Sequence, residues 1–233
     1  MNELIIILVA ILPGLVLGIY IWKRDSKPEP TILLLKAVIY GAMICVPVVI
    51  VESVLSTLFF GVDDSPTSLI GTIVESFGVA AIPEEVFKLL ALWLILKNNS
   101  DYDEHFDGIV YAVCIGLGFA TVENVLYLFD NIDNWQGVAC VRALLAVPAH
   151  YIFAILMGYY YSIFHFVNRS KENFVLIIFV SVLAHGIYDT LALSGRVEPA
   201  LGSTFTAVLI YFCFKMHKLA QEKVMKQIEK DLN

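Results

Sequence analysis

Seven long runs of apolar residues set the main constraint on how this 233-residue chain can fold. An α-helix needs about 20 apolar residues to cross the hydrocarbon core of a bilayer, and most of the runs reach about that length. Hydrophobic residues make up 59% of the chain and charged residues only 16%, more apolar surface than a soluble chain could bury. The runs cover residues 4–22, 32–60, 69–96, 108–129, 138–164, 174–193 and 200–214. Because only helices or closed barrels satisfy the backbone in lipid, the sequence predicts an all-α, polytopic transmembrane helical bundle of about seven spans.

The domain organisation follows from the same pattern. No internal repeat or low-complexity segment interrupts the runs, so residues 1–214 are expected to form one transmembrane domain. The charged segment 215–233 is expected to be a cytoplasmic tail. The net charge of −7 argues against nucleic acid as a partner and leaves the lipid bilayer as the expected environment. Four cysteines stand singly, without a C-x-x-C pair, so neither a zinc ribbon nor a disulfide framework is indicated.

The placement of lysine and arginine predicts the orientation in the membrane. Basic residues follow the first, third and fifth spans and recur through 215–233, whereas the loops of the opposite side hold few. Since such residues gather on the cytoplasmic side, we expect a multi-pass plasma-membrane protein with its N-terminus outside and its C-terminus in the cytoplasm.

Three charged residues, Glu84, Glu85 and Lys88, interrupt the third apolar run. Charges at membrane depth are costly and usually functional. On a helix the ammonium can lie against either carboxylate, at spacings of four and three residues. Because the two glutamates project about 100° apart, they are not expected to serve Lys88 equally. A structural ion pair with Lys88 would leave one of the two glutamates unpaired. We therefore interpret these residues as half of an intramembrane active site.

Three further spans carry ionisable groups at a similar depth. Glu123 lies in the fourth span, His150 follows Pro148 in the fifth, and His185 and Asp189 form an i, i+4 pair in the sixth. A carboxylate in that position fixes the tautomer of an imidazole. Each residue alone has a structural explanation, such as a hydrogen bond to a neighbouring helix. Structural explanations would have to apply independently in four spans at one depth, so a shared site is the favoured interpretation.

Two kinds of hydrolysis fit these residues. In one, His150, His185, Glu123 and Asp189 bind zinc while a glutamate acts as general base toward water. In the other, a glutamate and a histidine activate water without a metal. No H-E-x-x-H or G-x-S-x-G motif is present. A proton-coupled membrane carrier and a non-catalytic membrane adaptor remain alternatives, since buried acid–histidine chains also form proton relays.

Several segments together resemble the PrsW family of bacterial intramembrane proteases. They are Glu84-Glu-Val-Phe-Lys88, His105-Phe-Asp-Gly-Ile-Val-Tyr111, Gly118-Phe-Ala-Thr-Val-Glu-Asn-Val-Leu-Tyr127, Arg142-Ala-Leu-Leu, the segment around His150, and His185-Gly-Ile-Tyr-Asp189. The resemblance covers most of the chain from the first to the sixth span. It implies site-1-type cleavage of a single-pass, membrane-anchored anti-sigma factor, a step in regulated intramembrane proteolysis that begins a stress response.

The resemblance also assigns roles to residues. The family is similar to the CAAX-protease and bacteriocin-processing superfamily, in which arginine, histidine and asparagine stand where this chain has Lys88, Glu123 and Asp189. These departures, with the additional His150, make a zinc site easier to build, and a metal-free glutamate protease of the CAAX type remains the alternative. Glu84 would activate the water, although Glu85 could exchange roles with it. The expected catalytic residues are Glu84, Glu85, Lys88, Glu123, His150 and His185, and the expected metal ligands are His150, His185, Glu123 and Asp189.

Overall fold

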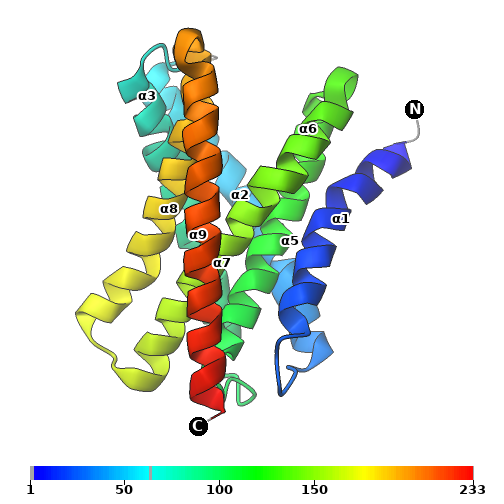
Figure 1. Cartoon of the computed structure of the whole chain (residues 1–233), viewed down its shortest axis with the longest axis vertical. Helices are drawn as coiled ribbons and strands as arrows, with labels where there is room; N and C mark the ends of the chain where they lie inside the picture. Colours follow the sequence, from blue (N-terminus) through cyan, green and yellow to red (C-terminus); the bar gives the residue numbers. More distant parts are fainter. Residues whose placement is uncertain (1–2, 63–64, 233) are drawn as a thin grey trace.

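The computed structural model describes residues 3–62 and 65–232, and every regular element in that part of the chain is helical. The helices lie lengthwise in one bundle, with the two termini at opposite ends (Figure 1). The prediction of an all-α helical bundle is therefore confirmed. The elements are α1 (Glu3–Trp22), α2 (Thr31–Phe60), α3 (Leu69–Val74), η1 (Glu75–Ala81), α4 (Ile82–Leu96), α5 (Asp107–Asp130), η2 (Ile132–Asn134), α6 (Trp135–Val141), η3 (Arg142–Ala146), α7 (Val147–Ser162), η4 (Ile163–Val167), α8 (Lys171–Val197), η5 (Pro199–Leu201) and α9 (Gly202–Asp231).

Six of the seven expected spans are long and apolar enough to cross a membrane. These six lie within Glu3–Trp22, Thr31–Phe60, Asp107–Asp130, Ile132–Val167, Lys171–Val197 and Pro199–Asp231. The expected third span is also helical throughout, as α3, η1 and α4 in succession, but it carries four ionisable residues. Its polar side chains are largely enclosed by the other helices, as described below. The chain is thus a multi-pass membrane protein in which one helical segment is unusually polar.

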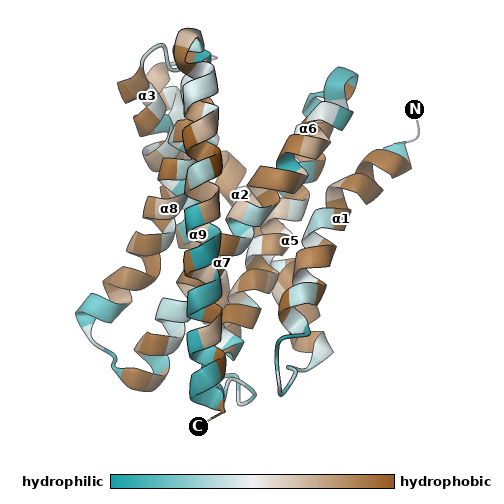
Figure 2. Ribbon diagram, viewed as in Figure 1, coloured by the Kyte–Doolittle hydropathy of each residue, from teal (hydrophilic) through white to brown (hydrophobic). Residues whose placement is uncertain are grey.

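The segment 215–233 does not begin at a helix boundary. Helix α9 runs without a break from Gly202 to Asp231, and its second half contributes buried Ala220, Val224 and Gln227. In Figure 2 this half is the most hydrophilic stretch of any long helix, which agrees with its charge. The separate cytoplasmic tail stays a prediction, but its inner face packs against the bundle.

The loops predicted to share one side of the membrane meet at one end of the bundle (Figure 1). The ammonium of Lys27, between α1 and α2, pairs with Asp103, between α4 and α5. His105 in the same α4–α5 loop pairs with Asp231 at the end of α9, with 2.9 Å between Nδ1 and Oδ1. The basic loops after the first and third spans and the C-terminal helix therefore lie together, as the orientation prediction requires.

Helix α5 occupies the centre of the bundle, and glycines allow α2 to cross it closely. A Cβ atom built on Gly41 of α2 would lie 2.0 Å from the carbonyl oxygen of Ile115, and one on Gly118 of α5 would lie 2.2 Å from that of Val38. Small residues at helix crossings are typical of membrane bundles, where close backbone contact supplies dispersion energy. The glycines thus hold α2 against α5, the helix that carries Glu123.

We expect Gly41→Ala to lower the free energy of unfolding by about 1–3 kcal/mol, because the added methyl group forces the two backbones apart. For a chain of this size that corresponds to a fall in Tm of roughly 2–10 °C. The matched control is Gly18→Ala on α1, where the new Cβ would meet its nearest neighbour, Cδ1 of Leu117, at 3.8 Å. Thermal unfolding of the purified proteins in one detergent measures both effects, and equal Tm values would contradict the close crossing.

Candidate active site

Two of the helices that carry site residues begin in the same unusual way. A π-helical turn, η1, leads directly into α4, and a second, η3, leads directly into α7. Proline is the second residue of both helices, as Pro83 and Pro148. Proline lacks the N–H of a regular helical hydrogen bond, and π-turns widen a helix locally, often at functional sites. The sequence thereby places Glu84 and His150 in the first turn of a helix deep inside the bundle.

Lys88 joins the two glutamates of α4. Its Nζ lies 2.8 Å from Oε2 of Glu84 and 2.8 Å from Oε1 of Glu85, and all three side chains are buried. The expectation that the glutamates would serve Lys88 unequally was therefore wrong. The long lysine side chain reaches between residues three and four positions back, so both can contact its ammonium. The same ammonium lies 3.2 Å from Nδ1 of His150 on α7.

His185 of α8 connects to the same carboxylates. Its Nδ1 lies 3.0 Å from Oε1 of Glu85, and its Nε2 lies 3.9 Å from Oε1 of Glu84. The i, i+4 pair predicted from the sequence is present, with 3.2 Å between Nε2 and Oδ2 of Asp189. The ring of Phe153 stacks on the imidazole at 4.8 Å between centroids. The imidazole is thus held by carboxylates at both nitrogens and by an aromatic ring on one face.

His150 links the α4 group to a second ion pair. Its Nε2 lies 2.8 Å from Oε2 of Glu123 on α5, and that same oxygen accepts a hydrogen bond of 2.8 Å from Nη2 of Arg142. Arg142 also donates from Nε to Oδ1 of Asn124, at 2.5 Å. Asn124 in turn donates to the carbonyl oxygen of Ala10 on α1, at 3.1 Å. The Glu123 carboxylate, which accepts contacts from His150 and Arg142, is thus held in one orientation.

The structure therefore brings every sequence-predicted site residue into one connected group. The connections run from α4 to α8 through Glu85 and His185, and from α4 through Lys88 and His150 to Glu123 on α5. The two imidazole rings lie 5.4 Å apart between centroids. The side chains of Glu123 and Asp189 are the most exposed of the set, at 18% and 20%. These two carboxylates mark the side from which the group is accessible.

The balance of fixed charges in this group is negative. Four carboxylates, of Glu84, Glu85, Glu123 and Asp189, face two cations that stay charged, Lys88 and Arg142. If both imidazoles are neutral, two negative charges remain uncompensated. Uncompensated charge is costly in a membrane interior. A divalent cation, or protons on both histidines, would neutralise the group.

The donor atoms available for a metal fit zinc. One ligand atom each from Glu84, Glu85 and His185 lies within 4.8 Å of the others, and carboxylate oxygen and imidazole nitrogen are common zinc ligands. Oε2 of Glu85 is buried without a hydrogen-bond partner among the described residues, as expected for an oxygen kept for another ligand. Of the four ligands predicted from the sequence, only His185 belongs to this convergent set. The other three pair elsewhere in the group, and their role as ligands stays a prediction.

Several side chains that shape the site were not assigned a role from the sequence. Arg142 was noted only at the end of a span and as part of the family resemblance, yet it fixes Glu123. The ring of Phe119 lies 4.4 Å from Nζ of Lys88, and the ring of Phe153 lies on His185. Arginine inside a span is a readable signal for a buried carboxylate partner. The two phenylalanines have no such signal, because apolar residues fill every span.

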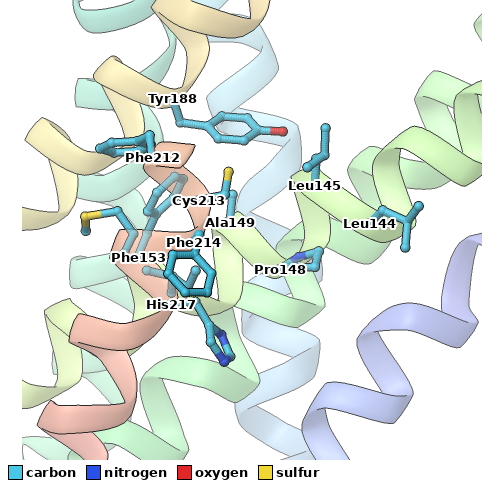
Figure 3. A pocket seen from close by; sticks show the side chains of 12 residues that line it. Leu144, Leu145, Pro148, Ala149, Phe153, Tyr188, Phe212, Cys213, Phe214 and His217 are labelled. Atoms are coloured by element: carbon cyan, nitrogen blue, oxygen red, sulfur yellow. The ribbon is translucent and has the colours of Figure 1, made fainter. Parts of the chain in front are cut away.

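An apolar cavity of about 230 Å³ lies beside the group, between α7, α8 and α9. Figure 3 shows Phe212, Cys213 and Phe214 of α9 opposite Pro148 and Ala149 of α7. The wall toward the polar group includes Phe153, which stacks on His185, and Tyr188, whose ring meets that of Phe153 edge-on. The cavity is thus separated from the catalytic candidates by one layer of aromatic side chains.

Comparison with known proteins gives a consistent result. A family model described as "PrsW family intramembrane metalloprotease" matches residues 29–216. The chain is similar to three proteins named "Protease PrsW". That of Oceanobacillus iheyensis is 34% identical over 203 residues, covering 87% of this chain and 86% of the relative. That of Clostridioides difficile is 33% identical over 233 residues (98% and 94%), and that of Bacillus subtilis is 32% identical over 230 residues (96% and 99%). No solved structure gives a significant match.

Proposed function

Because this chain belongs to the PrsW family of intramembrane proteases, we propose that it hydrolyses a peptide bond of a membrane-spanning substrate with water activated by Glu84. The chain is a peptidase, which removes the carrier and adaptor alternatives. The observation that carries the mechanism is the meeting of Glu84, Lys88, His150 and His185 from three helices. Lys88 contacts Glu84 and His150 at 2.8 and 3.2 Å, and His185 lies 3.9 Å from Glu84. Such a set can take a proton from water and return it to a leaving amine.

Glu84 is the better candidate for the general base. Both Lys88 and His185 contact Oε1 of Glu85, whose side chain is fully buried. Lys88 holds only Oε2 of Glu84, and within the described chain Oε1 of Glu84 has no hydrogen-bond partner. A general base needs one such oxygen, oriented but free to accept a proton. Glu85 also keeps one, but its side chain is fully buried, whereas that of Glu84 is 6% exposed. We therefore assign the base to Glu84 and the positioning of Lys88 and His185 to Glu85.

The histidines take complementary roles in this proposal. His150, held by Glu123 at Nε2, presents Nδ1 toward Lys88 and lies 4.0 Å from Glu84 through that nitrogen. It can receive a proton from the region of the base and pass it to the amine that leaves. Asp189 fixes the imidazole of His185, which faces Glu84 from α8. The Lys88 ammonium supplies a positive charge close to where an oxyanion develops.

The metal, which we propose to be zinc, would be held by Glu85 and His185, with Glu84 directly beside it. Asp189 would orient the ligating imidazole of His185, as carboxylates do in many metal sites. Lys88 would hold the carboxylate of Glu85. When bound, zinc supplies Lewis-acid polarisation of the scissile carbonyl and makes water a stronger acid. Of the predicted ligand set, this assignment retains His185 as a ligand. His150 and Glu123 take part in proton transfer instead.

The substrate we propose is the one the family resemblance implies, a single-pass anti-sigma factor in the plasma membrane. Cleavage would begin the release of a stress-response sigma factor. The proposed orientation places the N-terminus outside and the C-terminus in the cytoplasm. A helical substrate hides its carbonyl groups in its own hydrogen bonds, so the span must unwind locally before cleavage. Small or helix-breaking residues near the cut are expected for that reason.

The experiment that tests this function uses the purified full chain in proteoliposomes with a single-span anti-sigma factor. We expect one cut within or beside the apolar span, mapped by mass spectrometry of the products. His185→Ala should abolish that cut while leaving the protein folded in the same detergent. Cleavage that continues unchanged in His185→Ala would contradict the proposed site.

The apolar cavity suggests where an apolar side chain of the substrate span is held, beyond the aromatic layer that borders the catalytic group. We expect Cys213→Trp, which fills the cavity from the α9 side, to lower cleavage about tenfold, the usual scale for a changed apolar pocket. The matched control is Cys140→Trp, at an exposed position on α6. Initial cleavage rates of the two variants measure the difference. Equal rates would mean that the cavity takes no part in substrate binding.

A further inference from the structure

A second group of carboxylates, two of them buried, lies far from the active site, at the end of the bundle where the α1–α2 and α4–α5 loops meet (Figure 1). One oxygen each of Asp25, Glu104 and Asp107 lies within 4.8 Å of the others. Asp25 is 7% exposed and Asp107 is fully buried. Along α5, Asp107 and Glu123 are separated by roughly 24 Å at the helical rise per residue. This group is therefore independent of the catalytic residues.

Two of the three carboxylates keep an oxygen without a partner. Oδ2 of Asp107 accepts hydrogen bonds from the backbone N–H groups of Asp103 and Glu104, at 3.1 and 2.7 Å. Oδ1 of Asp25 accepts one from the N–H of Lys27, at 3.0 Å. The other oxygen of each, Oδ1 of Asp107 and Oδ2 of Asp25, is buried and has no hydrogen-bond partner in the described parts of the chain. Buried acceptors of this kind call for a donor or a cation.

Within residues 3–62 and 65–232, none of the three carboxylates forms an ion pair with a basic side chain. The nearby ammonium of Lys27 pairs with Asp103 instead. A neighbouring buried acid, Glu29, accepts a hydrogen bond from the hydroxyl of Tyr111. Burial raises the pKa of Asp25 and of Glu29, since their charged forms lose solvation. The hydrogen bond from the backbone N–H of Lys27 to Asp25 opposes this rise without cancelling it.

We propose that Asp25, Glu104 and Asp107 bind a hard divalent cation, Ca²⁺ or Mg²⁺, that fastens the α1–α2 loop to the start of α5. The donors are all carboxylate oxygens, the ligands these ions prefer, and the set offers neither nitrogen nor sulfur to select zinc. The cation satisfies both unpartnered oxygens and offsets the repulsion among the acids. Because the ligands come from two loops, the ion stabilises the fold at this end of the bundle.

The test measures Tm of the full-length protein in detergent during separate titrations with CaCl₂ and MgCl₂. We expect at least one ion to raise Tm by about 5 °C or more at a concentration well above its Kd. Asp25→Asn and Asp107→Asn should abolish the rise. An asparagine at position 25 can still accept the hydrogen bond from Lys27, so that variant is expected to fold even if the second does not. The matched control, Asp101→Asn, removes an exposed charge from the α4–α5 loop, which also holds Glu104, and should keep the full rise in Tm.

Three outcomes would overturn the proposal. The first is no rise with either ion, and the second is a rise that persists in Asp25→Asn. The third is an equal rise with KCl at the same ionic strength, which would assign the effect to charge screening. His185→Ala separates this site from the active site, because it should leave the Ca²⁺ or Mg²⁺ effect unchanged. Loss of the effect in that variant would place the ion at the catalytic group and reject the second site.

Discussion

Replacing Glu84 by glutamine is expected to lower the rate of substrate cleavage by about 10²–10⁴-fold, the usual contribution of a general base. The amide has the shape of the carboxylate, and its oxygen can still accept the hydrogen bond from Lys88, 2.8 Å from Oε2 in the wild-type protein. It cannot take a proton from water. Glu85 remains to pair with the buried ammonium. The fold should therefore survive while the chemical step does not.

Initial rates in proteoliposomes, with substrate at saturation, measure this effect, and Tm in detergent shows whether the variant is folded. Glu75→Gln is the matched control, because Glu75 lies in the same membrane segment and has no ion pair with the catalytic group in the described structure. It should cleave within about twofold of wild type, as expected for a residue that binds neither substrate nor transition state. A folded Glu84→Gln protein that cleaves normally would transfer the role of base to Glu85.

The parts of the fold and site that depend on local sequence could be predicted. The apolar runs predicted the helices, because a bilayer imposes their length and composition. The pairing of His185 with Asp189, and of Lys88 with Glu84, followed from helical spacing alone and is present at 3.2 and 2.8 Å. In each case the partners belong to the same helix, so their distance is determined by the helix itself.

Contacts between helices could not be predicted in the same way. His150 alone suggested a packed histidine, yet it lies between Lys88 and Glu123, because α7 packs against α5 and brings His150 within reach of Lys88 on α4. Rotation of a helix about its axis decides which groups meet, and apolar sequence on all sides leaves that rotation undetermined. The glycine contact between Gly41 and Ile115 fixes it for α2 and α5. The packing of residues 215–231 against the bundle was missed for a related reason, since charge on one face of that helix conceals the buried face that includes Val224.

Removal of a bound metal is expected to have the second large effect. Lewis-acid assistance is worth several kcal/mol, so chelation with 1,10-phenanthroline should lower cleavage by about 100-fold or more, and added Zn²⁺ should restore it. The purified protein should contain about one zinc per chain, because the proposed ligands Glu85 and His185 and the base Glu84 belong to one convergent group. Elemental analysis of the wild type measures this directly. Glu85→Gln and His185→Ala should lose the zinc, because each removes a proposed ligand.

The charge balance of the site makes this experiment decisive between the two mechanisms. With Lys88 and Arg142 as the only fixed cations of the group, the four carboxylates need two further positive charges. Zinc would supply both, whereas a metal-free enzyme would need two protons on the imidazoles or carboxylates of this group. His165→Ala, outside this group on η4, is the control that should keep both zinc and activity. Full activity in protein that holds no stoichiometric metal would reject the zinc site and favour the metal-free mechanism.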